Sequence, residues 1–179
     1  MKGMVFTEFL EMVEEKFDYE TVDEILSKEE LASGGIYSSV GIYSHKEMFV
    51  LVQNLHEKSG IPIGNLLEVF GEYLFGSLYK AYGSMFQDLS SAFDMINSIE
   101  GYIHVEVRKL YPDAELPTFE IISRDDKVLV IDYTSERRMS DLVVGLMRGC
   151  FKEFGEEIDI QKAEVAGRPN TVRFTLTKV

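Results

Sequence analysis

The segment from Ile131 to Arg137 holds the side chains that are best suited to bind a ligand. It continues the apolar run Val128–Ile131, which is typical of a strand. Alternate side chains of an extended chain share a face, so Tyr133, Ser135 and Arg137 would point the same way. A guanidinium binds a carboxylate through paired hydrogen bonds, and neighbouring hydroxyls satisfy further lone pairs. The three predict a carboxylate clamp; alternatively, Arg137 pairs with a nearby acidic residue and Tyr133 is only a strand-end aromatic.

His104 is a second residue capable of chemistry. It stands in a helical pattern with Ile103 and Val107 on its face, so its imidazole is expected to point toward apolar surroundings. Such a histidine is either a hydrogen-bonded core residue or the axial ligand of an iron porphyrin. The other two histidines, His45 and His56, fall on polar helix surfaces and are expected to be solvated.

Composition narrows the class of protein. A chain of 179 residues predicts one domain, residues 1–179, large enough to bury roughly 70% of its unfolded surface and enclose a pocket. A net charge of −13 disfavours nucleic acid and anionic membranes as partners. No apolar run approaches the roughly 20 residues that span a bilayer, and no basic, apolar leader is present, so we expect a cytoplasmic protein. The single cysteine, Cys150, excludes an internal disulfide and a thiolate metal cluster.

The surrounding pattern predicts an α+β fold, with about six or seven helices and a four-stranded antiparallel sheet near the C-terminus. Helical spacing covers residues 2–17, a helix capped by Thr21, one from Ser44 to Gly60, and residues 63–82, 85–97, 98–111 and 138–154. Thr21 with Glu24 and Ser44 with Glu47 match capping boxes. The strands are Thr118–Ser123, Lys127–Tyr133, Glu157–Val165 and Thr171–Thr177, and Ser33–Ser39 is expected to be a loop.

Two glycines interrupt the most apolar helix. Gly71 and Gly76 lie within residues 63–82, and a glycine inside a helix costs about 1 kcal/mol relative to alanine. Their presence suggests that a bulky group, or simply another helix, approaches the backbone there.

With these residues in place, the sequence resembles the H-NOX family, the haem nitric oxide/oxygen binding domains found alone in bacteria and within soluble guanylate cyclase. The resemblance covers essentially the whole chain. The matching motifs are Met1-Lys2-Gly3, Phe70-Gly71-Glu72-Tyr73-Leu74-Phe75, His104 followed by Lys109-Leu110-Tyr111-Pro112, Pro117, and the Tyr-x-Ser-x-Arg signature at Tyr133, Ser135 and Arg137. It implies the H-NOX fold enclosing haem b, iron protoporphyrin IX.

The resemblance also implies roles for individual residues. His104 would be the proximal ligand of the ferrous iron. Tyr133, Ser135 and Arg137 would hold the two haem propionates, and Pro117 would press on the porphyrin. The distal wall would be lined by apolar side chains: Val5, Phe9, Leu74, Leu78, Leu142 and Leu146.

One position bears on which gas is bound. Oxygen-binding members of the family place a tyrosine hydroxyl over the iron, and the aligned residue here, five positions after Arg137, is Leu142. Bound dioxygen becomes negatively charged and is stabilised by a donor, whereas nitric oxide needs no such help. An apolar wall therefore favours nitric oxide, with carbon monoxide as a further ligand. Tyr73 and Tyr79 are the alternative sources of an inward hydroxyl.

The resemblance implies a sensor rather than an enzyme, and no nucleophile–base pair or metal-ligand cluster suggests catalysis. Nitric oxide would release the bond to His104 and change the conformation of the chain. Because the sequence ends at Val179 with no output domain, we expect a separate partner, a histidine kinase or a cyclic-di-GMP enzyme. The alternatives are an oxygen sensor, a haem transporter and a haem-free interaction module.

Overall fold

The computed structural model describes residues 1–28 and 30–179 and, within them, the side chains of all residues except Met85 and Leu110. The helical elements are α1 (Gly3–Lys16), α2 (Tyr19–Ser27), α3 (His45–Ser59), α4 (Ile63–Tyr82), the 3-10 turn η1 (Gly83–Phe86), α5 (Ala92–Asn97), the π-helical turn η2 (Ile99–Ile103), α6 (His104–Leu110) and α7 (Ser140–Glu153). The strands β1 (Thr118–Arg124), β2 (Val128–Thr134), β3 (Ile158–Glu164) and β4 (Thr171–Lys178) form one antiparallel sheet in the order β1-β2-β4-β3. The predicted α+β architecture is confirmed.

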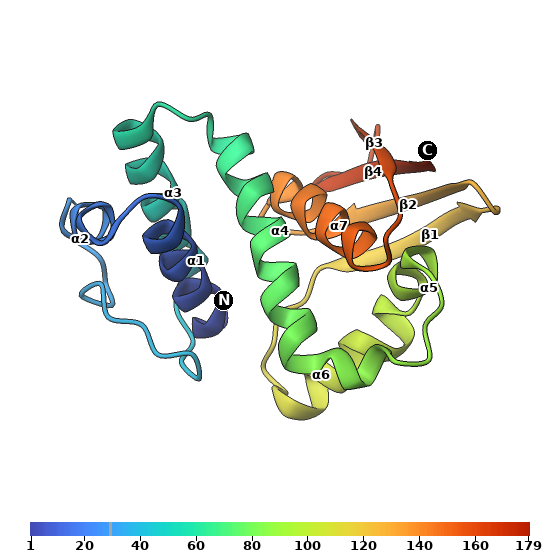
Figure 1. Cartoon of the computed structure of the whole chain (residues 1–179), viewed down its shortest axis with the longest axis horizontal. Helices are drawn as coiled ribbons and strands as arrows, with labels where there is room; N and C mark the ends of the chain where they lie inside the picture. Colours follow the sequence, from blue (N-terminus) through green and yellow to red (C-terminus); the bar gives the residue numbers. More distant parts are fainter. Residues whose placement is uncertain (29) are drawn as a thin grey trace.

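The long helix α4 stands between two groups of elements (Figure 1). On one side lie α1, α2 and α3; on the other, α7 covers the sheet, α5 lies beside β1, and α6 lies near the end of α4. Each group has its own apolar core. Phe6, Phe9 and Phe70 are fully buried in the first core, and Phe151 and Phe174 are buried in the second.

The crossing of α4 and α7 depends on glycine. A Cβ atom on Gly71 would lie 2.2 Å from the carbonyl oxygen of Leu142, and one on Gly145 would lie 2.0 Å from that of Glu68. Any side chain at either position would force the helix backbones apart. The close approach expected at Gly71 is therefore confirmed as helix packing, whereas a Cβ on Gly76 would meet nothing within 4 Å.

Helix ends agree with the sequence pattern in part. Ser44 caps α3 as predicted, and Gly60 ends this helix in the left-handed conformation, with φ of 72°. The expected cap of α2 is wrong: Asp18 is the cap, and its Oδ1 accepts a 2.7 Å hydrogen bond from the backbone N–H of Thr21. The predicted helices over 85–97 and 98–111 are replaced by η1, α5, η2 and α6.

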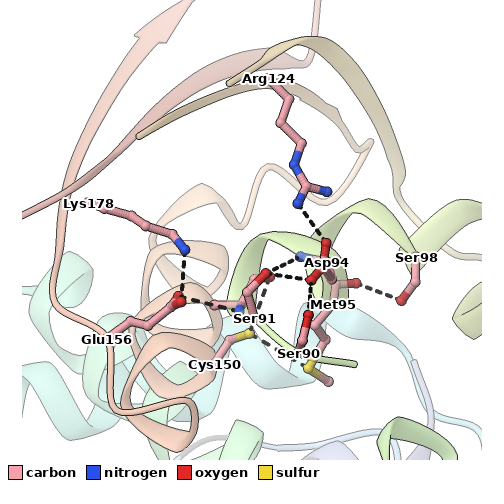
Figure 2. A network of polar contacts seen from close by, with 10 residues as sticks. Ser90, Ser91, Asp94, Met95, Ser98, Arg124, Cys150, Glu156 and Lys178 are labelled. Atoms are coloured by element: carbon pink, nitrogen blue, oxygen red, sulfur yellow. Dashed lines mark hydrogen bonds and ion pairs between the residues drawn. The ribbon is translucent and has the colours of Figure 1, made fainter. Parts of the chain in front are cut away.

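A polar network fastens the start of α5 to the sheet (Figure 2). The Asp94 carboxylate accepts hydrogen bonds from Arg124 of β1 at 2.6 Å and from the Ser91 hydroxyl at 2.7 Å. Beside it, Lys178 of β4 donates to Glu156 at 2.8 Å. Because α5 leads directly into η2 and α6, this network fixes where the chain toward His104 begins.

The Asp94 network predicts a pH-dependent stability. Hydrogen bonding from Arg124 lowers the pKa of Asp94 to about 2 from its ordinary value of 3.8. Since the folded pKa lies below the unfolded one, this stabilisation is complete above about pH 4 and is lost as the pH falls toward 2. We expect Asp94→Asn to lower the free energy of unfolding at pH 7 by about 1–2 kcal/mol, and to weaken the acid dependence between pH 4 and 2, both measured by urea denaturation. Asp88→Asn, at an exposed aspartate, is the control; equal losses in the two variants would contradict the assignment.

Candidate functional site

A cavity of about 850 Å³ lies between the two groups of elements. Sites for small ligands and cofactors commonly measure roughly 300–1,000 Å³. Its wall includes ten of the eleven residues that the resemblance assigns to the haem site: His104, Tyr133, Ser135, Arg137, Pro117, Val5, Leu74, Leu78, Leu142 and Leu146. Residues from α1, α4, α6, α7 and the β1–β2 side of the sheet thus converge on one largely apolar space.

Phe9 is the exception, since it is not among the residues that line the cavity. Its side chain is fully buried in the first core and packs edge-to-face on Phe70, with 5.1 Å between ring centroids. Where α1 meets α4, these two rings fill the space between the helices. The cavity wall is formed instead by Met4 and Val5, nearer the start of α1.

His104 is buried, with 7% of its surface exposed. Its Nδ1 lies 3.0 Å from Oε1 of Glu100, and within the described part of the chain Nε2 has no hydrogen-bond partner. A carboxylate only accepts, so Nδ1 bears the proton and Nε2 keeps its lone pair. Burial, opposed by Glu100, lowers the pKa of His104. The result is a neutral imidazole at neutral pH with a donor atom available to a metal in the cavity.

The clamp residues meet in the cavity, but not by the predicted strand geometry. Strand β2 ends at Thr134, and a turn follows, in which the Arg138 N–H donates to the carbonyl oxygen of Ser135 at 3.2 Å. Arg138 adopts a left-handed φ of 51°. Tyr133 therefore reaches the cavity from the end of a strand, and Ser135 and Arg137 reach it from a turn. The prediction that all three share one face of an extended strand is wrong.

The donors of this clamp remain available to a carboxylate. Burial raises the pKa of Tyr133, so its hydroxyl stays protonated. Arg137 donates to Glu115 at 3.2 Å, as the alternative interpretation expected, but the Glu115 side chain is 87% exposed. An exposed ion pair contributes about 0–1 kcal/mol. A ligand carboxylate in the cavity can replace it at little cost.

The loop between α2 and α3 closes part of the cavity, which the sequence pattern did not reveal. Tyr43 and His45 line the wall, so the expected solvation of His45 is only partly correct. Glu47, expected to complete a capping box, is buried and accepts hydrogen bonds from the hydroxyls of Ser33 at 2.5 Å and Tyr37 at 3.0 Å. The spacing of Glu47 from Ser44 predicted a capping box, and it gave no indication that Glu47 holds this loop.

The two candidate distal tyrosines differ in position. The Tyr73 hydroxyl donates to Glu15 at 3.1 Å in an exposed position, and Tyr73 does not line the cavity. Tyr79 does line it, with its ring stacked between Phe75 and Phe86 at centroid distances of 6.0 and 6.1 Å.

The donor set narrows what the cavity can hold. Among the described residues, no three histidine, cysteine, aspartate or glutamate side chains gather as a metal site. The cavity instead offers one imidazole, an apolar wall and a group of donors that can bind carboxylates. This combination matches a metal held in an apolar macrocycle that carries carboxylate groups. The residues present therefore fit a haem. No helix in the described part of the chain is long and apolar enough to cross a membrane.

Comparisons with known proteins agree with this geometry. The family model described as Haem-NO-binding matches residues 2–162. The fold is similar to that of the unliganded Fe(II) H-NOX protein from K. algicida, with 39% identity, a TM-score of 0.94, and coverage of 100% of this chain and 97% of that one. The IWP-051-bound Fe(II)CO H-NOX from Shewanella woodyi shows 39% identity, a TM-score of 0.85 and coverage of 100% and 95%. The Fe(II)NO H-NOX protein from S. oneidensis, at 24% identity, shares the fold, with a TM-score of 0.90 and coverage of 100% and 99%. No curated protein gives a significant match.

Proposed function

The chain belongs to the haem-NO-binding family, whose domains bind haem and sense gases, and from this premise we propose that it is a nitric oxide sensor whose iron is held by His104. The observation that supports this assignment most directly is the buried imidazole in the wall of a cavity large enough for a cofactor, with Nδ1 bonded to Glu100 and Nε2 without a hydrogen-bond partner among the residues that the structure describes. Haem, when bound, would supply a ferrous iron that His104 holds and that binds a small gas molecule.

The remaining cavity residues have complementary roles in this proposal. Tyr133, Ser135 and Arg137 donate hydrogen bonds to the propionates, since the guanidinium matches a carboxylate and the hydroxyls satisfy further lone pairs. Pro117 lies in the same wall, and its rigid ring would press on the macrocycle. These assignments use donors and surfaces that already face the cavity.

The apolar side chains opposite determine which gas is retained. Leu142 and Leu146 of α7, with Val5, Leu74 and Leu78, line the cavity and have no hydrogen-bond donor in their side chains. A hydrogen bond to a charged acceptor in a dry site contributes roughly 1.5–3 kcal/mol, or about 10–100-fold in affinity. Dioxygen would lack this stabilisation, whereas nitric oxide and carbon monoxide do not require it.

Signalling follows from a change in the bond to His104. If His104 holds the haem iron, binding of nitric oxide would favour release of His104, and the segment of η2 and α6 would then be free to relax. A ligand shifts an equilibrium between conformations only through a difference in its affinity for the two, and the lost bond supplies this difference. The family points to a histidine kinase or a cyclic-di-GMP enzyme as the protein that receives the signal, and we propose a partner of this kind.

The gas assignment predicts a gain of function at Leu142. We expect the wild-type ferrous protein to form no stable oxygen complex in air, and Leu142→Tyr to bind oxygen about 10–100-fold more tightly because it adds a donor. The measurement is the absorption spectrum of each ferrous protein titrated with oxygen, nitric oxide and carbon monoxide.

Leu142→Phe is the control, since it adds an aromatic ring without a hydroxyl. Oxygen binding by Leu142→Tyr no tighter than by Leu142→Phe would refute the role of a donor at this position. Stable oxygenation of the wild-type protein that is lost in Tyr79→Phe would instead identify an oxygen sensor with Tyr79 as the donor.

A further inference from the structure

Glu100 joins His104 to the sheet through a single oxygen atom. Its Oε1 lies 3.0 Å from Nδ1 of His104 and also accepts the backbone N–H of Phe119, on β1, at 2.9 Å. The two donors stand 4 and 19 residues further along the chain. One carboxylate thus contacts both the imidazole that faces the cavity and the strand that leads to the hairpin.

The local backbone brings these groups together. Glu100 lies in η2, where the N–H of His104 bonds to the carbonyl oxygen of Ile99, five residues back. Such π-helical turns are rare and are frequently found at functional sites. Here the turn sets Glu100 directly behind the imidazole, on the side away from Nε2.

We propose that Glu100 is a positioning residue that determines how strongly His104 binds iron and transmits the release of His104 to β1. This inference rests on the proposed function, because it concerns the ligand assigned there. A carboxylate that accepts the second N–H of a ligating histidine fixes the tautomer and orientation of the ring and raises its basicity. Glu100 therefore opposes the release of His104 and raises the threshold at which the sensor switches.

The contact with Phe119 gives the release a route to the clamp. The Phe119 ring lies 6.0 Å from the His104 ring and 5.3 Å from the Tyr133 ring, measured between centroids. When His104 moves away, Glu100 keeps only its backbone partner, and the packing of Phe119 between the two rings changes. The imidazole and the propionate-binding strand are thereby linked through one side chain of β1.

The test is Glu100→Gln, which keeps the shape of the side chain and removes its charge. We expect haem affinity to fall about 10–100-fold, the iron–histidine stretching frequency in resonance Raman spectra to decrease, and a larger share of the nitric oxide complex to lack the histidine bond. Glu120→Gln is the matched control, because it removes one charge from β1 next to Phe119 and its carboxylate pairs with Arg168 instead. The control is expected to behave as wild type in all three measurements.

A second readout uses the haem-free protein. Nitrogen-15 NMR is expected to show His104 protonated at Nδ1 in the wild type and as a mixture of tautomers in Glu100→Ala, with faster amide hydrogen exchange at Phe119. An unchanged tautomer and unchanged exchange in Glu100→Ala would overturn the positioning role, whether or not haem binds. If haem binds through His104 and the stretching frequency is the same in wild type and Glu100→Gln, the inference fails while the proposed function stands. Absence of haem from the wild-type protein would instead refute the proposed function, and the tautomer would still decide the role of Glu100.

Discussion

His104→Gly protein is expected to lose most of its haem during purification and to regain it when imidazole is added to the buffer. The reason is that iron would lose its only proposed protein ligand: His104 lines the cavity with its Nδ1 bonded to Glu100, and among the described residues no cluster of metal-binding side chains replaces it. Free imidazole fits the space that the deleted ring leaves and supplies the same donor atom. The measurement is the molar ratio of haem to protein, from the Soret absorbance with and without imidazole.

His45→Gly is the control for this experiment. His45 also lines the cavity, as the first residue of α3, and is expected to be dispensable. Stoichiometric haem with an unchanged Soret band in His104→Gly, without added imidazole, would show that the ligand assignment is wrong. Loss of haem from His45→Gly but not from His104→Gly would show that His45, and not His104, is the iron ligand.

The second large effect is expected for Arg137→Ala. Loss of charged hydrogen bonds to a propionate costs roughly 1.5–3 kcal/mol, so haem should dissociate about 10–100-fold more readily. The rate of haem transfer to an excess of apomyoglobin measures this effect. The fold should be retained, since the only partner of the guanidinium is the exposed Glu115 among the residues that the structure describes.

Two further variants separate propionate binding from general charge effects. Arg138→Ala removes a cation from the next residue, whose Nε donates to Asn170 at 2.7 Å in an exposed position, and should leave haem transfer unchanged. Glu115→Gln removes the group that competes for Arg137 and should slow haem transfer. Equal transfer rates for wild type and Arg137→Ala would remove Arg137 from the site.

The helices were predictable where the apolar pattern is long and its ends are marked. The bounds predicted for α4, residues 63–82, agree with the structure: Pro62 precedes the helix, and the winding changes to the 3-10 turn η1 at Gly83. The region before His104 was not predictable in the same way. A continuous helical pattern does not distinguish α-helical from π-helical winding, and η2 brings Glu100 to Phe119, a contact that spans 19 residues.

The site residues were identified more accurately than their geometry. Tyr133, Ser135 and Arg137 do meet in one cavity, but the turn after Thr134 directs the last two, whereas residue spacing alone suggested a strand. The packing of Phe9 in the first core was not predictable, because an aromatic residue on an apolar helix face does not reveal which of two cores it enters. The loop over Ser33–Ser39 was predicted, but its attachment to α3 was not, because Glu47 finds its partners 10 and 14 residues away. The roles of these residues toward haem remain predictions.

The central claim is that an iron porphyrin lies in this cavity, held by His104 and open to nitric oxide. The absorption spectrum of the purified ferrous protein, recorded before and after nitric oxide is added, tests it most directly. We predict a Soret band at one haem per chain that shifts, on addition of nitric oxide, to the position typical of haem without a histidine bond. A folded, colourless protein prepared with ample haem, or a Soret band that nitric oxide leaves unchanged, would contradict it.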